Sequence, residues 1–161
     1  MEQDVTTESD ESEFRIDPAS TFGYRLWHVH HAWQRRLEAA LGKVDLTHMQ
    51  FVVLAWTMRL ITAGSVPSQT GIADAAGVDR MMVSKILRLL EGKGYVQRCC
   101  HPDDPRANRV DLTRSGHAAL ARALPILRAT QEEFFGRLGA AGKKDLSVQL
   151  DRLLAFEGIG F

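Results

Sequence analysis

Residues 68–92 decide the fold, and they read SQTGIADAAGVDRMMVSKILRLLEG. Ser68 can cap a short helix that Gly77 would end, because serine accepts hydrogen bonds at helix starts and glycine tolerates the left-handed conformation at helix ends. Asp79 can cap a second helix that runs to about Gly92. Two short helices joined by a tight turn that contains glycine are typical of a helix-turn-helix.

The second of these helices has two different faces. Apolar side chains at i, i+3, i+4 and i+7 predict its core face: Val83, Ile86, Leu87 and Leu90. The opposite face carries side chains that can contact base edges or phosphates in a major groove: Arg80, Met81, Ser84, Lys85 and Arg88. A solvated amphipathic helix shows the same pattern, so this face alone leaves both interpretations open.

A β-hairpin is expected next. Residues 95–100 and 109–112 contain strand-forming residues, and the polar loop between them holds two prolines. The tip of this hairpin, a wing, would present side chains to a narrow minor groove: Arg106, Asn108 and Arg109, with Asp104 orienting Arg106. A charged tip is common in hairpins of any function, but a helix, a turn, a basic helix and a basic hairpin in this order favour DNA binding.

Two helices precede the helix-turn-helix. The first is expected from about Ser20 to Leu41, with a single apolar stripe. The second begins at Thr47, whose side chain can form a capping box with Gln50. Its first residues are apolar nearly all round, which predicts a buried helix.

Two more helices follow the wing. Thr113 is expected to cap a long helix to about Gly139, kinked or irregular at Pro125, and a last helix spans 143–156. Together they carry more apolar side chains than one small domain easily covers: Leu120, Leu124, Leu127, Phe134, Phe135, Leu138, Leu146, Leu150, Leu153, Leu154 and Phe156.

The composition is that of a soluble globular protein. The 161 residues match one domain, with 45% hydrophobic and 25% charged residues. No apolar run approaches the roughly 18 residues of a transmembrane helix, and the acidic start is unlike a secretory signal, so we expect a cytoplasmic protein. The adjacent Cys99 and Cys100 cannot make a disulfide framework, which fits a reducing compartment.

The net charge of zero conceals an asymmetry. Residues 1–17 carry seven acidic side chains and one arginine, a net charge of −6, and are expected to form a disordered tail. Residues 80–114 carry eight basic and four acidic side chains. This local excess fits a polyanionic partner, although solubility alone would also explain it.

Four motifs resemble those of one family. The stretches LTHMQ (46–50), LEGKGYVQR (90–98), DPR (104–106) and LTRSG (112–116) follow the order and spacing of the MarR family of bacterial transcriptional regulators, and the resemblance covers residues 21–156. It implies a mainly α-helical winged-helix homodimer with a small β-hairpin wing. Such proteins bind pseudo-palindromic operators, mostly as repressors, and release DNA when a small molecule binds or when they are oxidised.

The resemblance also assigns residues to the DNA interface. It places phosphate contacts on Ser68, Gln69 and Thr70. It places the contacts of the recognition helix on Arg80, Met81, Met82, Ser84, Lys85 and Arg88. The wing arginine of the family corresponds to Arg106, with Asp104 as the acid that orients it. The two methionines stand where small hydroxyl residues are common in the family, which points to contacts with thymine methyls or to packing. Pro105 replaces a basic residue often found before the wing arginine.

The chain can be divided accordingly. Residues 1–17 are the tail and residues 18–161 the MarR-type domain, in which residues 46–112 form the winged helix-turn-helix lobe. Residues 18–45 and 113–161 would dimerise. A two-fold dimer would bury the surplus apolar side chains and place two DNA-binding lobes about one helical turn apart.

A small aromatic or phenolic anion is the effector that the sequence favours. Aromatic walls with few polar groups are typical of small-molecule pockets, and six side chains could line one between the dimer helices and the lobe: Trp27, His28, His31, Met49, Trp56 and Arg59. Each could equally be core. Although His30 and His48 add further imidazoles, histidines clustered on one helix lack the converging ligands of a zinc site, so no metal or cofactor is expected.

Oxidation is a second possible signal, because Cys99 and Cys100 lie where the wing starts. A disulfide between adjacent residues would be strained. Since alternate residues of a strand point to opposite faces, we expect one of the two thiols to be buried and inert.

These patterns predict a sequence-specific DNA-binding transcriptional regulator, a repressor whose effector changes the distance between its two lobes. The alternative is a winged-helix module or antagonist that binds proteins without specific DNA binding, its acidic tail imitating DNA or covering the basic face. An enzyme is not expected, because the sequence shows no nucleophile elbow, P-loop, dinucleotide fingerprint or clear metal-ligand motif.

Overall fold

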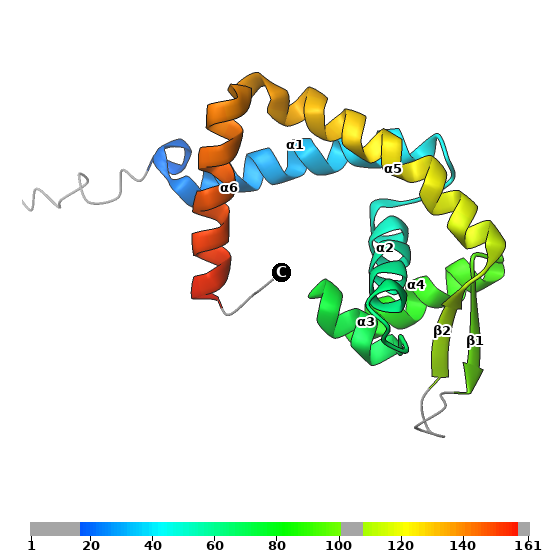
Figure 1. The fold of residues 1–161 in the computed structure, drawn as a ribbon. Helices are drawn as coiled ribbons and strands as arrows, with labels where there is room; N and C mark the ends of the chain where they lie inside the picture. Colours follow the sequence, from blue (N-terminus) through cyan, green and yellow to red (C-terminus); the bar gives the residue numbers. More distant parts are fainter. Residues whose placement is uncertain (1–16, 101–107, 158–161) are drawn as a thin grey trace, which may run out of the picture. The chain divides into compact units, whose positions relative to one another are not determined.

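The structure is a computed structural model that describes residues 17–100 and 108–157 (Figure 1). The chain divides into two compact units, one up to Trp33 and one from Gln34, and each is described by itself. The elements in chain order are η1 (Pro18–Ser20), α1 (Phe22–Gly42), α2 (His48–Thr62), α3 (Gln69–Ala76), α4 (Arg80–Gly92), β1 (Val96–Cys100), β2 (Asn108–Leu112), α5 (Arg114–Phe135), η2 (Gly136–Leu138) and α6 (Gly139–Phe156).

The helix-turn-helix is confirmed with the predicted caps. The Ser68 hydroxyl oxygen accepts a hydrogen bond from the N–H of Gly71 at 3.0 Å, and Gly77 ends α3 with a left-handed φ of 61°. Asp79 caps α4, because its Oδ1 accepts hydrogen bonds from the N–H groups of Met81 and Met82 at 2.9 and 3.1 Å. The predicted core face of α4 is buried.

The core of the larger unit forms around α2, which contacts α3, α4, α5 and β2. Thr47 and Gln50 form the predicted capping box at its start. The second half of α1 contributes Leu37 and Leu41 to this core. α2 itself contributes Val53 and Leu54, and the elements that surround it contribute further large core side chains: Ile72, Val83, Leu87, Leu90 and Val110.

The wing is an antiparallel hairpin in which Val96 pairs with Leu112 and Cys100 with Asn108. Its tip, residues 101–107, lies outside the described residues, as do residues 1–16 of the predicted tail. The expectation that one cysteine is buried is wrong, since both Cys99 and Cys100 are exposed. They lie at the far end of a two-stranded sheet, where neither face of β1 is covered.

The LTRSG motif has a structural reason. Thr113 caps α5 and also donates its hydroxyl to the carbonyl of Gly94 at 2.6 Å, while its N–H donates to the carbonyl of Tyr95 at 3.1 Å. A Cβ at Gly116 would lie only 2.0 Å from that Tyr95 oxygen. Glycine therefore lets the first turn of α5 lie directly against the start of the wing.

The C-terminal helices differ from the predicted bounds. α5 continues through Pro125 and ends at Phe135, and the η2 turn leads into α6 at Gly139, which has a φ of 66° (Figure 1). The long helix is therefore shorter, and the last helix longer, than the sequence indicates. The break falls in GRLG (136–139), where two glycines lower helix propensity.

The predicted surplus of apolar side chains is observed in part. Of the eleven, five are exposed, five are half-buried, and Leu120 is buried within the chain. α6 buries none of its residues. Five of the predicted side chains on α5, η2 and α6 are exposed: Leu124, Leu138, Leu150, Leu153 and Phe156.

The smaller unit contains η1 and the first half of α1. Asp17 accepts a hydrogen bond from the N–H of Ala19 at 3.0 Å, and the short η1 turn explains why α1 begins at Phe22 rather than at Ser20. Trp33 is half-buried, whereas five other large apolar side chains of this unit are exposed: Phe22, Tyr24, Leu26, Trp27 and Val29. Within residues 17–100 and 108–157, no helix combines the length and apolar character needed to cross a membrane.

Candidate nucleic-acid interface

The outward face of α4 presents polar and apolar groups together. Lys85 and Arg88 are exposed, and Ser84 is half-buried beside them. The Arg88 Nε donates to the Ser84 carbonyl at 3.4 Å, which leans the guanidinium along the helix surface. Met81 is 76% exposed and Met82 is 48% exposed. The structure thus brings these five predicted residues to one solvent-facing surface of a helix whose other side is anchored in the core.

Arg80 is directed toward the preceding helix. Its guanidinium lies 3.3 Å from the Asp74 carboxylate, and both side chains are mostly exposed. Such an exposed pair is weak and exchanges readily with solvent or another anion. Arg80 can therefore still approach a phosphate, but in this structure it connects α4 with α3.

The start of α3 lies beside the wing. Ser68 forms a β-bridge with Arg109, and the Val110 N–H donates to the carbonyl of Pro67 at 2.8 Å. Thr70 is exposed, whereas Ser68 and Gln69 are half-buried. The predicted phosphate contacts of α3 and Arg109 on β2 are thus neighbours, a juxtaposition that no local sequence pattern reveals.

Arg109 has a partner that sequence reasoning missed. Its Nε donates to Asp111 Oδ2 at 2.7 Å, and this hydrogen bond raises the pKa of the guanidinium above its usual value. The two residues are two apart on one strand, so their side chains share a face, and this spacing was the available signal. Asp104 and Arg106 lie outside the described residues, and only the backbone of Asn108 is described.

A second ion pair joins the wing to α4. The Arg98 Nε donates to Glu91 Oε2 at 3.0 Å, and this contact lowers the pKa of the Glu91 carboxyl. Since Glu91 lies in the last turn of α4 and Arg98 on β1, the pair holds the wing against α4. Sequence reasoning did not single out either side chain as a functional residue.

Lys93 connects the end of α4 to the turn before α2. Its Nζ donates to the carbonyl of Asp45 at 2.6 Å and lies 3.0 Å from the Asp45 carboxylate. The same Nζ lies 3.4 Å from Oε1 of the buried Gln50, the residue that completes the capping box. Asp45 adopts a φ of 57°, so a turn in the left-handed region presents both oxygens to one ammonium.

The candidate effector residues divide between the two units. In the smaller unit, the Trp27 ring makes edge contacts with His28 and His31 at centroid distances of 4.7 and 4.4 Å. In the larger unit, the Arg59 guanidinium lies 5.5 Å from the centroid of Trp56, and Met49 is half-buried. The six residues as one pocket stay a prediction. Among the described residues, no cluster of three or more His, Cys, Asp and Glu side chains is arranged to hold a metal ion.

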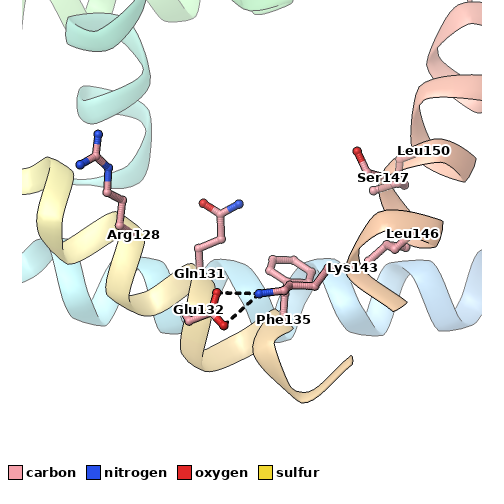
Figure 2. A pocket seen from close by; sticks show the side chains of 8 residues that line it. All are labelled: Arg128, Gln131, Glu132, Phe135, Lys143, Leu146, Ser147 and Leu150. Carbon is pink, nitrogen blue, oxygen red and sulfur yellow. Dashed lines mark hydrogen bonds and ion pairs between the residues drawn. The ribbon is translucent and has the colours of Figure 1, made fainter. Parts of the chain in front are cut away.

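A cavity of about 500 Å³ lies between α5 and α6 (Figure 2). The sequence did not predict it. Lys143 of α6 donates to both carboxylate oxygens of Glu132 on α5 at 2.9 and 2.8 Å, which closes one end. The other side chains that line it are Arg128, Gln131, Phe135, Leu146, Ser147 and Leu150. The cavity therefore combines apolar side chains of both helices with the exposed guanidinium of Arg128 on α5.

Comparison with known proteins identifies the arrangement. The model of the MarR family matches residues 46–107. An uncharacterized HTH-type transcriptional regulator of Bacillus subtilis, YdcH, is 35% identical over 140 residues, 87% of this chain and 94% of that protein. A mutant of MarR from Escherichia coli, solved in complex with operator DNA, has a TM-score of 0.74 at 26% identity and covers 82% of this chain and 92% of its own. The Mycobacterium tuberculosis MarR family protein Rv2887, solved with salicylic acid, has a TM-score of 0.63 at 28% identity, with coverages of 83% and 96%.

The two-helix motif, the hairpin packed against its second helix and the surrounding helices define a winged helix-turn-helix protein of the DNA-binding class. The chain belongs to the MarR family of transcriptional regulators. This confirms the resemblance drawn from the four sequence motifs.

Proposed function

We propose that the protein is a cytoplasmic, sequence-specific repressor that inserts α4 into the major groove and its wing into the minor groove of duplex DNA. The outward face of α4 carries this proposal, because Ser84, Lys85 and Arg88 lie opposite the buried side of an anchored helix. Hydroxyl, ammonium and guanidinium groups in this position are suited to base edges and phosphates. The proposed interface also includes the start of α3 and the wing residues Asp104, Arg106, Asn108 and Arg109.

The active form in this proposal is a homodimer. The exposed apolar side chains of α6 support it, since Leu153 is 62% and Phe156 94% exposed. A second copy would cover them and the apolar side of the cavity between α5 and α6. Residues 18–45 and 113–161 would form the interface, and residues 46–112 would form the DNA-binding lobe.

The effector in this proposal is a small aromatic anion. The relative Rv2887, solved with salicylic acid, supports this class of ligand. In this chain the Arg59–Trp56 pair offers a cation beside an aromatic face, which suits an aromatic carboxylate or phenolate. Salicylate would release DNA from the wild-type protein, and Arg59→Gln would need a higher salicylate concentration for the same release.

The test of DNA recognition is fluorescence anisotropy with DNA from upstream of the protein's own gene, beside a scrambled duplex, at several salt concentrations. We expect a large preference for the natural duplex and a steep decrease of affinity with salt. The double variant Lys85→Gln/Arg88→Gln should lose at least about tenfold in specific affinity, since a base contact contributes roughly 1–3 kcal/mol. Lys43→Gln, which removes one positive charge from the turn after α1, is the single-charge control.

Equal, weak binding to both duplexes would contradict the proposal. It would favour a winged-helix module that binds another protein. We propose no catalytic activity for the chain, in keeping with its family of transcriptional regulators.

A further inference from the structure

We propose that Met81 is a specificity-determining residue that recognises the C5-methyl group of a thymine in the major groove. The inference rests on the proposed DNA binding and deepens it, because it names the base that the first turn of α4 selects. Three observations carry it: the position of Met81 on the helix, the partners of its neighbours and the chemistry of base edges.

Met81 lies directly opposite the buried side of α4. At 100° per residue, it shares one face with Lys85 and Arg88, four and seven positions further along the helix. The core side chains of α4 lie on the other side, and Met81 is 76% exposed. Its side chain therefore does not pack in the core, which removes packing as an explanation for an apolar residue at this position.

The polar groups around Met81 already have partners within the chain. The N–H groups of Met81 and Met82, which would otherwise attract a phosphate, both donate to the Asp79 carboxylate. Arg80 is paired with Asp74. The end of the recognition helix that enters a major groove first thus presents an apolar side chain, with a hydroxyl and two cations one and two turns behind it.

Base edges offer one apolar partner in the major groove. The groove displays acceptors and donors from all four bases, and its one apolar group is the C5-methyl of thymine. A methionine side chain is long, unbranched and polarisable, so it can adapt to a methyl group without a fixed hydrogen-bond geometry. Met82 is less exposed and lies about a quarter turn further round the helix, which makes it the natural comparison.

The test is a cycle that combines protein variants with DNA lacking the methyl groups. The natural upstream duplex is prepared with thymidine or with deoxyuridine throughout, and the scrambled duplex likewise, so that general effects of uracil can be subtracted. The full-length wild type should bind uracil DNA about fourfold more weakly for one buried methyl, and roughly fifteenfold more weakly if each half-site provides one.

The variants locate the effect. Met81→Ala should bind thymine DNA more weakly and show little further loss on uracil DNA, while its melting temperature stays unchanged because the side chain is exposed. Met81→Leu should restore the uracil penalty, and Met81→Gln, similar in length but polar, should not. Met82→Ala should keep the wild-type penalty.

The inference would be overturned if Met81→Ala lost as much affinity on uracil DNA as the wild type does. It would also be overturned if this loss disappeared in Met82→Ala but not in Met81→Ala. The inference would also be overturned if the wild type preferred the natural over the scrambled duplex but bound thymine and uracil DNA equally well. This result would leave the proposed function intact. Failure to prefer the natural duplex at all would instead overturn the proposed function, and the inference with it.

Discussion

α4 and α6 both expose large apolar side chains, but only α4 also has buried ones. Val83, Leu87 and Leu90 hold α4 in the core, whereas α6 buries none of its residues. An exposed Met81 is therefore an addition to a helix that is already anchored. An exposed Leu153 belongs to the main apolar stripe of a helix that lacks a buried side. Exposed apolar side chains therefore indicate different partners in the two helices: DNA for α4 and a second copy of the chain for α6.

The largest effect is expected from breaking the apolar stripe of α6. Leu153→Asp removes two leucine side chains from the proposed dimer interface, one per subunit, at about 2 kcal/mol each. The dimer should weaken by about 4 kcal/mol, roughly a thousandfold in Kd. Sedimentation velocity over a range of concentrations measures this change. Lys144→Asp, which places the same side chain on the opposite face of α6, should leave the dimer intact, and an intact Leu153→Asp dimer would exclude α6 from the interface.

The second largest effect is expected in the lobe that contains α4, where α5 packs against the start of the wing. Gly116→Ala forces a methyl group against the Tyr95 carbonyl oxygen and should destabilise the lobe by about 3 kcal/mol. Urea unfolding followed by circular dichroism gives the change. Gly92→Ala is the control, because a Cβ at Gly92 meets no atom within 4 Å, so it should be neutral or slightly stabilising. Equal stability of the two variants would show that α5 can retreat from the wing without cost.

A smaller effect is expected where α4 meets the turn before α2. Lys93→Met removes the ammonium that contacts the backbone carbonyl and the carboxylate of Asp45. This change should lower the free energy of unfolding by about 1 kcal/mol. Asp45→Asn removes only the charge and keeps a residue that tolerates the left-handed φ of this turn. A double-mutant cycle of the two, measured by urea midpoints, should show coupling, and additive effects would contradict a direct interaction.

The smallest effect concerns the pair that joins the wing to α4. Arg98 lowers the pKa of Glu91 below that of a free glutamate carboxyl, so the pair stabilises the folded protein at neutral pH and loses its contribution as the pH falls through the lowered pKa. Glu91→Gln should reduce stability at pH 7 by less than about 1 kcal/mol, because the pair is partly exposed. The difference in melting temperature between variant and wild type should shrink as the pH is lowered from 7 through the acidic range. A constant difference from pH 7 to pH 3 would show that charge is not the cause.

Local chemistry explains why the helix-turn-helix was predictable to the residue. Ser68, Gly77 and Asp79 set the ends of α3 and α4 through hydrogen bonds that reach no further than four residues, and the core face of α4 follows from periodicity alone. The end of α5 was not predictable in this way. The two glycines of GRLG (136–139) lower helix propensity, but they do not fix the residue at which α5 ends, and the structure places the turn into α6 there.

The candidate site was predictable in its residue types and less so in its arrangement. The exposed face of α4 follows from the sequence, but the pairing of Arg80 with Asp74 and of Arg109 with Asp111 depends on which oxygens come within reach. The burial of one cysteine was wrongly expected, because strand alternation says which residues share a face but not whether another layer covers that face.

By itself, the sequence determined the helix-turn-helix, its caps and the family, since these depend on contacts between near neighbours and on four short motifs. The tertiary structure decided which distant groups meet: Ser68 beside Arg109, Lys93 on Asp45, and the first turn of α5 against Tyr95. It also decided that α6 has no buried side. Burial and pairing are properties of the whole folded chain, because each depends on what every other element leaves uncovered.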